Sequence, residues 1–131
     1  MKAVLDGISS ANRGGATVYI GLAGDVELGL PRIECESEAS EEYPEGTGNF
    51  WVTTRVRVLS DANAAIATHE SRVGYVYDQI WSNGLAADLS AALSDYHCFG
   101  TRNRRILGTE KDDRTLVTAF EFEALCCPAD S

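Results

Sequence analysis

Two carboxylates and two thiols lie close together in one stretch of the sequence, RTLVTAFEFEALCCP, at residues 114–128. The stretch alternates apolar and polar residues, which predicts a β-strand. On such a strand Glu121 and Glu123 share a face and lie about 7 Å apart. Carboxylates at that spacing could act as an acid–base pair or hold a divalent cation. Cys126 and Cys127 could add a soft metal site or a redox pair.

A second strand offers the two glutamates a simpler role. FWVTTRVRVLS, at residues 50–60, also alternates and places Arg55 and Arg57 on its polar face. Oppositely charged side chains on neighbouring strands pair across a sheet. We therefore predict that Arg55, Arg57, Glu121 and Glu123 are cross-strand pairing partners, and that none of them is catalytic or binds a metal.

The cysteines do not form a recognisable metal or redox motif. The four of them are Cys35, Cys98, Cys126 and Cys127, and no two are spaced as CxxC. Zinc sites usually present such pairs twice. Cys126 and Cys127 point to opposite faces while the strand lasts, and a disulfide between neighbours would strain the backbone. We expect Cys126 to be a small buried side chain that continues the apolar face of the strand.

The two histidines do not complete an active site either. His69-Glu70 begins like the zinc-protease motif HExxH, but position 73 is Val, so the motif fails. His69 is expected to be a partly buried helix residue. His97 and Cys98 are adjacent and would point to opposite faces of a strand. We predict no catalytic residue, no metal and no cofactor; a small thiol- or metal-dependent enzyme is the alternative from a different class.

Composition narrows the choice of partners. The 131 residues suit one domain, residues 1–131, and the net charge of −9 disfavours a protein that binds nucleic acid by neutralising phosphates. No apolar run approaches the roughly 20 residues of a membrane span. The first residues lack the apolar centre of a signal peptide, so we expect a cytosolic chain with reduced thiols and no membrane partner.

Hydrophobic periodicity predicts three helices and five strands. The helices are expected at 1–12, 62–81 and 85–95, and the strands at 16–22, 30–39, 50–60, 101–108 and 114–128. Strands outnumber helices, and hairpin-like connections dominate. This order predicts an α+β fold in which a mostly antiparallel β-sheet has two or three helices packed on one face.

Opposite charges gather in two segments. Residues 37–49, SEASEEYPEGTGN, have no periodicity and the composition of a flexible acidic loop. The segment 25–45 holds eight acidic residues and one basic residue. A run of arginines follows later, at Arg102, Arg104 and Arg105. The acidic loop could be solvated, could order against a neighbouring subunit, or could line a channel that repels DNA.

The order of these segments resembles a known family, the tail terminator or tail-completion proteins of long-tailed bacteriophages, which include small neck proteins that join head to tail. The similarity follows an N-terminal helix and the strand ATVYIGL, then LPRIECE running into the acidic loop. FWVTTRVRVLSD then leads into the helix NAAIATHESRVGYVYDQIW. The helix LAADLSAAL, an arginine-containing strand and the final RTLVTAFEFEAL complete it. It covers nearly the whole chain as a pattern of elements.

The resemblance implies a virion structural protein that is assembled in the host cytoplasm and is not an enzyme. Its subunits would form a ring, commonly of six copies, that caps the tail tube and joins it to the head–tail connector. DNA would pass through the lumen without specific binding. The partners implied are other copies of the chain, the tail tube protein and the connector or adaptor protein. Another ring-forming adaptor or tube subunit is the close alternative.

A closed ring needs two different surfaces that meet head to tail. The acidic loop and the arginine run are opposite in charge, so we expect them to meet between adjacent subunits. The interface residues predicted on this basis are Glu38, Glu41, Glu42, Tyr43, Glu45, Trp51, Arg102, Arg104 and Arg105.

Overall fold

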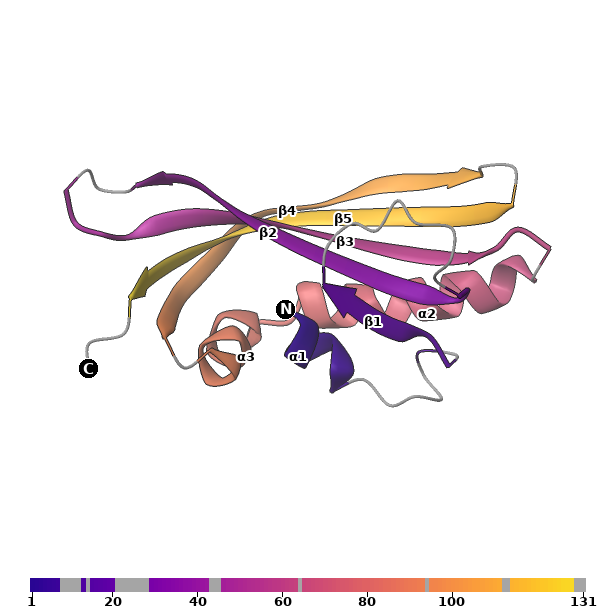
Figure 1. The fold of residues 1–131 in the computed structure, drawn as a ribbon, viewed down its shortest axis with the longest axis horizontal. Coiled ribbons are helices and arrows are strands. Elements are labelled where there is room, and N and C mark those ends of the chain that lie inside the picture. The colour runs from indigo at the N-terminus through magenta and orange to yellow at the C-terminus, as the bar shows by residue number, and fades with distance from the viewer. Residues whose placement is uncertain are drawn as a thin grey trace.

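The computed structural model describes residues 1–7, 13, 15–20, 29–42, 46–63, 65–93, 95–111 and 114–128. These residues form three helices and five strands, shown in Figure 1. In chain order they are α1 (Lys2–Asp6), β1 (Thr17–Ile20), β2 (Arg32–Glu42), β3 (Phe50–Asp61), α2 (Ile66–Ile80), α3 (Leu85–Ala92), β4 (Tyr96–Lys111) and β5 (Thr115–Pro128).

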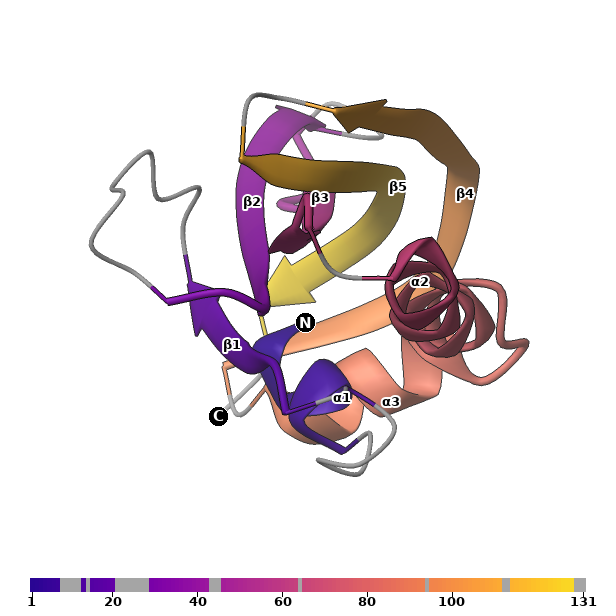
Figure 2. The same cartoon turned by 90° about the vertical axis from the view of Figure 1, so that its right-hand side faces the viewer.

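The strands build one sheet in the order β1-β2-β3-β5-β4. Only the β1–β2 pair is parallel among the described strands, and the other three pairs are antiparallel. The helices lie on one side of the sheet, below it in Figure 1, and the end-on view of Figure 2 shows that the sheet is strongly curved. This arrangement confirms the α+β fold predicted from the sequence.

The two central strands have the alternation that their sequences predict. Val56 of β3 lies opposite Phe120 of β5, and both side chains are fully buried on the side of the sheet that the helices cover. One residue away, Arg55 lies opposite Glu121 on the other side of the sheet. Successive strand residues point to opposite faces, so the pattern divides the sheet into an apolar inner face and a charged outer face.

The core fills the space between the inner face and the helices. The fully buried large side chains of the core include Phe120 and Phe122 of β5, Ile80 of α2 and Leu85 of α3. Trp81 packs its ring edge against Phe120 with centroids 6.1 Å apart. Because α3 has only eight residues, it is too short to be stable alone, and its apolar contacts with the core must hold it in place.

Strand β4 departs from regular alternation. Its register against β5 shifts at three places, between Cys98 and Gly100, between Arg102 and Arg105, and between Ile106 and Thr109. Asn103 and Gly108 have positive φ values of 54° and 88° at the second and third shifts. Asn and Gly are the residues that tolerate this conformation at β-bulges. The bulges let β4 bend from beside α3 to the far end of the sheet, as Figure 1 shows.

Several predicted boundaries were wrong. The acidic loop expected from residue 37 is β-strand as far as Glu42, where β2 pairs with β3. At the start of this segment Glu36 and Glu38 alternate with the small residues Ser37 and Ala39, and the acidic composition masks this alternation. β4 runs over 96–111 instead of 101–108, because the bulges hide its periodicity. α1 ends at Asp6, and residues 8–12 of the predicted first helix lie outside the described part of the chain.

Candidate functional site

The outer face of the sheet carries charges of alternating sign from strand to strand. Glu36 of β2, Arg55 of β3, Glu121 of β5 and Arg105 of β4 form a continuous row across the sheet register. Each position in the row faces a residue of opposite charge on the neighbouring strand. The outer face is therefore an ionic surface whose charges alternate in sign from strand to strand, although the register of β4 shifts on both sides of Arg105.

Glu121 is the centre of this row. Arg55 Nε donates to its Oε2 at 2.8 Å, and Arg105 Nε donates to its Oε1 at 3.1 Å. These hydrogen bonds, led by the one from Arg55, lower the pKa of Glu121, and burial opposes them. The carboxylate is thus ionised and fully engaged by two guanidinium groups, which leaves it unsuited to proton transfer near neutral pH.

Glu123 is held in a similar way one row further along. Asn103 Nδ2 donates to Oε1 at 2.6 Å, and Arg102 donates to Oε2 at 3.2 Å. The Asn103 bond is the main cause of a lowered pKa for Glu123. The guanidinium of Arg102 also lies 3.5 Å from the centre of the Trp51 ring, a cation–π contact with β3.

A third carboxylate on this face is completely buried. Glu34 has no exposed surface, accepts from Arg32 Nε at 2.8 Å, and accepts from Arg57 Nη1 at 3.3 Å. Burying a carboxylate is costly unless cations and hydrogen bonds compensate it. Glu34 could not be recognised from the sequence, because an alternating strand places many glutamates at the surface and nothing in the pattern marks one of them as buried.

The predicted pairing set is therefore arranged differently from the simplest expectation. The structure brings Arg55 to Glu121, but Arg57 pairs with Glu34 of β2 and not with Glu121 or Glu123. Glu121 also pairs with Arg105 of β4, and Glu123 pairs with Arg102 of β4. The arginine run at 102–105 is the sequence feature that could have predicted these partners, because β4 is the neighbour of β5.

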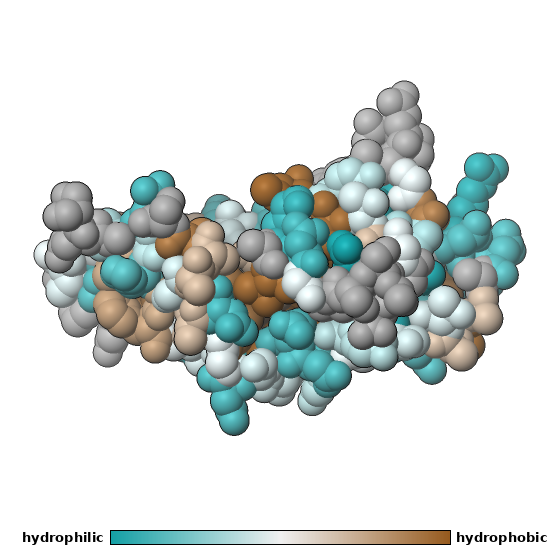
Figure 3. Space-filling model, turned by 90° about the horizontal axis from the view of Figure 1, so that it is seen from below, coloured by the Kyte–Doolittle hydropathy of each residue, from teal (hydrophilic) through white to brown (hydrophobic). Residues whose placement is uncertain are grey.

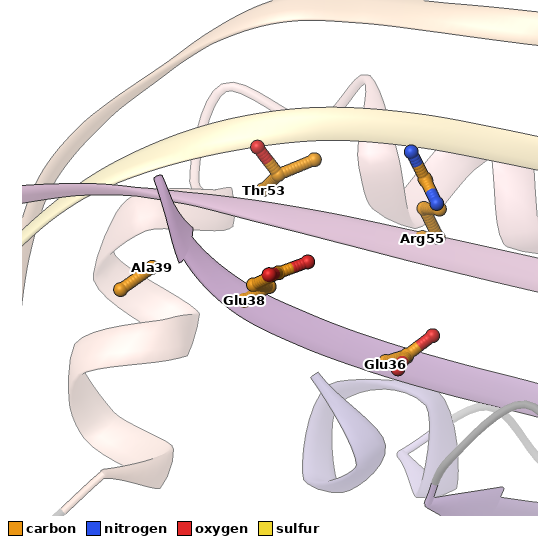
Figure 4. Close-up of a pocket in the computed structure, with 5 residues that line it drawn as sticks. All are labelled: Glu36, Glu38, Ala39, Thr53 and Arg55. Carbon is orange, nitrogen blue, oxygen red and sulfur yellow. The ribbon is translucent and has the colours of Figure 1, made fainter. Parts of the chain in front are cut away.

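Two glutamates line a shallow hollow on the outer face. Figure 4 shows Glu36 and Glu38 of β2 beside Thr53 and Arg55 of β3. Both glutamates are exposed, and within the described residues neither forms an ion pair. The hollow is open and acidic, so its surface is available to a cationic partner but lacks the enclosure of a small-molecule site.

The predicted interface residues lie in two places. Glu38, Glu42 and Trp51 belong to the hairpin formed by β2 and β3, where the backbone of Glu41 also pairs with Trp51. Tyr43 and Glu45 lie outside the described residues. Glu42 accepts a hydrogen bond from the Gly46 backbone within that hairpin.

The arginine run on β4 is largely engaged within the subunit. Arg102 and Arg105 pair with Glu123 and Glu121, as described above. Arg104 donates to Thr101 on its own strand, and its Nε is buried without a partner in the structure. Of the three arginines, Arg104 is the one with no acidic partner among the described residues.

The inner face has an apolar groove beside α3. It has a volume of about 430 Å³ and is lined mainly by apolar side chains. Phe50 and Val52 of β3, Leu89 and Leu93 at α3, and Tyr96 of β4 form its walls, and Cys98 and Cys126 also line it. Figure 3 views the molecule from the helix side, where apolar surface occurs as separate patches between polar side chains.

His69 lies in the core and links α2 to the sheet. It was expected to be partly buried, but it has no exposed surface. Its Nδ1 lies 2.7 Å from Ser60 Oγ, and its Nε2 lies 2.8 Å from Thr118 Oγ1. Arg72 Nη1 donates to Ser60 Oγ at 2.8 Å. A neutral ring that accepts from Ser60 and donates to Thr118 satisfies these groups, and burial lowers the pKa of His69 accordingly.

The polar clusters described above hold the fold together and form its outer surface. The Ser60–His69 pair is sealed from solvent, and Glu34, Glu121 and Glu123 on the outer face are held by arginines. No group of three or more His, Cys, Asp or Glu that could hold a metal is found within the described residues. None of the helices in that part of the chain is both long and apolar enough to span a membrane.

Comparison with known proteins gives a likeness in fold. No protein-family model matches the sequence, and no curated protein matches it. Among solved structures, a chain in a structure described as the virion of a native gene transfer agent particle is similar, with a TM-score of 0.56 and 20% sequence identity. The match covers 92% of this chain and 86% of that chain, so the two share one fold over nearly their full lengths.

Proposed function

We propose that this chain is a structural protein of a virion, and that it acts as a tail terminator in the neck of a long-tailed bacteriophage. The observation that carries the proposal is the likeness in fold to a virion chain over 92% of this protein. The order of elements in the sequence supports the same assignment, because it resembles the tail terminator family along nearly the whole chain. At 20% identity the likeness itself establishes the fold.

The shape of the subunit suits head-to-tail assembly into a ring. Figure 1 shows a long sheet whose β2–β3 hairpin and β4–β5 hairpin extend in opposite directions. The β2–β3 hairpin carries Glu38 and Glu42 and adjoins the apolar groove, whereas the β4–β5 hairpin exposes Ile106 and Leu107. Unlike surfaces at opposite ends are what a heterologous, closing interface requires.

The free edge of β4 strengthens this argument. β4 is sixteen residues long and lies at the edge of the sheet, with no neighbouring strand on its outer side among those described. Soluble proteins protect long edge strands, because their unpaired backbone groups promote association. We place the neighbouring copy against this edge and the adjoining arginines, in a ring of six subunits.

The charge of the chain fits the passage of DNA. With 20 acidic and 11 basic residues, each subunit repels the phosphate backbone at a distance. On the outer face, the basic side chains Arg55, Arg57 and Arg105 already pair with glutamates. A lumen formed by such subunits would let DNA slide without holding it. The other partners proposed are the tail tube protein and the head–tail connector.

The test is the oligomeric state of the purified full chain. Negative-stain electron microscopy and native mass spectrometry, each over a range of protein concentrations, should detect closed rings of six subunits. Rings should be favoured at high concentration, because subunit and ring exchange by mass action. Metal analysis and thiol-reactivity assays on the same sample address the enzyme alternative.

The possible outcomes separate the alternatives. Open tubes or stacked rings would favour a tube subunit, and a ring of another stoichiometry would favour an adaptor. A monomer at all concentrations, together with a stoichiometric bound metal, would contradict the structural role and favour the enzyme.

A further inference from the structure

We propose that Cys98 and Cys126 are a reversible thiol pair that reacts with small-molecule disulfides, such as oxidised glutathione, to form a disulfide across the β4–β5 hairpin. The site consists of two buried thiols at the base of the apolar groove. It is independent of the proposed role in a ring, because every contact that defines it lies within one subunit.

The backbone places the two residues in the right kind of pair. Cys98 and Cys126 lie directly opposite in the β4–β5 register. The N–H of Cys98 donates to Ser90 Oγ at 2.6 Å, and Ser90 Oγ donates to the Cys98 carbonyl at 3.0 Å. Both backbone groups of Cys98 thus point away from β5. In an antiparallel ladder this identifies a non-hydrogen-bonded pair.

That geometry suits a disulfide. Non-hydrogen-bonded pairs have Cα atoms about 4.5 Å apart and side chains that approach closely, which falls within the range spanned by disulfides. The two Sγ atoms lie 3.0 Å apart as free thiols. Formation of the bond therefore needs only side-chain adjustment and no separation of the strands.

The groove gives a small disulfide a route to the thiols. Cys98 and Cys126 retain 9% and 8% of their surface, and both line the groove. Cys35 is also buried, but its Sγ donates to the Tyr19 carbonyl at 3.5 Å and not to another thiol. Cys127 is more exposed and lies on the opposite face of β5, opposite His97.

The two thiols have different roles in the exchange. A hydrogen bond from Cys126 lowers the pKa of Cys98 to about 7, whereas the same contact raises the pKa of Cys126. Cys98 therefore supplies the thiolate near neutral pH, and thiolates are the attacking species in disulfide exchange.

The chemistry is a two-step exchange. The Cys98 thiolate attacks one sulfur of the small disulfide, which breaks that S–S bond and releases one small thiolate. The Cys126 sulfur, after loss of its proton, then attacks Cys98 Sγ and releases the second small thiolate. The released thiolates take up the two protons lost by the protein. Two electrons pass from the protein thiols to the small disulfide.

The bond would fix the part of the molecule beside the groove. It would join the start of β4 to the end of β5 across 28 residues of sequence separation. Ser90 already ties α3 to Cys98, so the disulfide would hold α3, β4 and β5 as one unit. Cross-links of this kind stabilise the folded state relative to the unfolded chain.

The experiment equilibrates the full chain with reduced and oxidised glutathione at a series of ratios, followed by acid quenching, alkylation and peptide mapping. The expected product has lost two hydrogen atoms and contains one disulfide between the Cys98 and Cys126 peptides. Its Tm should exceed that of the reduced protein by roughly 5 °C or more.

Variants define the site. Cys127→Ser and Cys35→Ala should keep both the cross-link and the Tm shift, whereas Cys98→Ser should lose both. Peptide mapping of the unaltered chain needs no variant, so the test stands even if Cys98→Ser does not fold. The proposal is overturned by a Cys126–Cys127 bond, by disulfides between chains, or by glutathione bound at Cys127 while Cys98 and Cys126 stay reduced.

Discussion

Glu34 is a buried carboxylate that pairs with two arginines. Its carboxylate is fully buried and held by Arg32 and Arg57. Replacement of Glu34 by Ala should lower the free energy of unfolding by about 3 kcal/mol, because it removes a buried carboxylate that pairs with the guanidinium groups of Arg32 and Arg57. Urea unfolding followed by circular dichroism measures the change.

The matched control for this prediction is Glu36→Ala. Glu36 is two residues away on the same face of β2 and is exposed. Its removal should change the free energy of unfolding by less than about 0.5 kcal/mol. Equal effects at the two positions would show that burial of Glu34 contributes nothing special.

His69 should make stability depend on pH. Burial, assisted by the nearby charge of Arg72, lowers the pKa of His69 below its usual 6.5 in the folded state. The unfolded chain therefore binds more protons just below that pH. The contribution of neutral His69 is complete above pH 6.5 and is lost as the pH falls towards the folded-state pKa. Urea unfolding at pH 5 to 8 should show stability rising with pH (a window of roughly three units around the ordinary histidine pKa).

His97 provides the control, since the chain has only these two histidines. His69→Gln should flatten the pH dependence around 6.5, whereas His97→Gln should leave it unchanged. An unchanged slope in His69→Gln would contradict the assignment of this pH dependence to His69.

Glu121 and Glu123 affect stability at lower pH. Because their pKa values are lowered in the folded state, the ionised side chains stabilise the fold above the ordinary glutamate pKa of 4.5, and this stabilisation is lost as the pH falls below it.

At the scale of elements, Ser90 links α3 to the sheet by two hydrogen bonds. Its hydroxyl satisfies both the N–H and the carbonyl of Cys98 on an edge strand. Ser90→Ala should lower the free energy of unfolding by about 1–3 kcal/mol, because both backbone groups lose a partner in a partly buried place. Hydrogen exchange at the Cys98 amide should accelerate. Ser71→Ala, at an exposed position of α2, is the control and should change neither quantity.

The sequence predicted the elements whose periodicity is regular. β3 and β5 alternate without interruption, so the faces of Val56, Arg55, Phe120 and Glu121 followed directly. The acidic composition masked the full extent of β2: the predicted strand ended at residue 39 and overlapped a predicted loop from residue 37, whereas β2 continues to Glu42. A pattern of solvent-exposed glutamates looks the same on a loop and on the outer face of a strand.

The thiol pair could not be found from the sequence for a related reason. An unbroken ladder that starts from the Lys111–Leu116 pair would set Cys98 opposite position 129. The three bulges in β4 together shift that partner to Cys126. Asn103 and Gly108 favour bulges, but neither residue type reveals how many residues a strand will insert.

At the scale of the whole molecule, the sheet joins surfaces that differ in charge and polarity. The β2–β3 hairpin is acidic, β4 is rich in arginine, and the groove is apolar. Arg102 and Arg105 are held by Glu123 and Glu121 within the subunit. Reversal of their charges would therefore disturb the subunit itself, so Arg104 is the position that reports on contacts between subunits.

We expect Arg104→Glu to weaken the proposed ring, because it would set like charges together where the acidic hairpin of one subunit meets β4 of the next. Native mass spectrometry and sedimentation should show fewer rings at low salt, with a smaller difference at high salt, since salt screens exposed charges. Lys111→Glu makes the same charge change on an exposed part of β4 and should leave the ring intact.

A second substitution identifies the partner of Arg104. Glu42→Arg, placed on the hairpin, should restore ring formation in the Arg104→Glu background, because the exchange recreates an opposite-charge pair with its polarity inverted. Each variant must first show the Tm of the original chain, which separates a defect in assembly from a defect in folding. If Arg104→Glu forms rings as readily as the original chain at every salt concentration, β4 does not meet the acidic hairpin. The ring contact would then have to be sought at the free backbone edge of β4, where association depends on hydrogen bonds and responds little to salt.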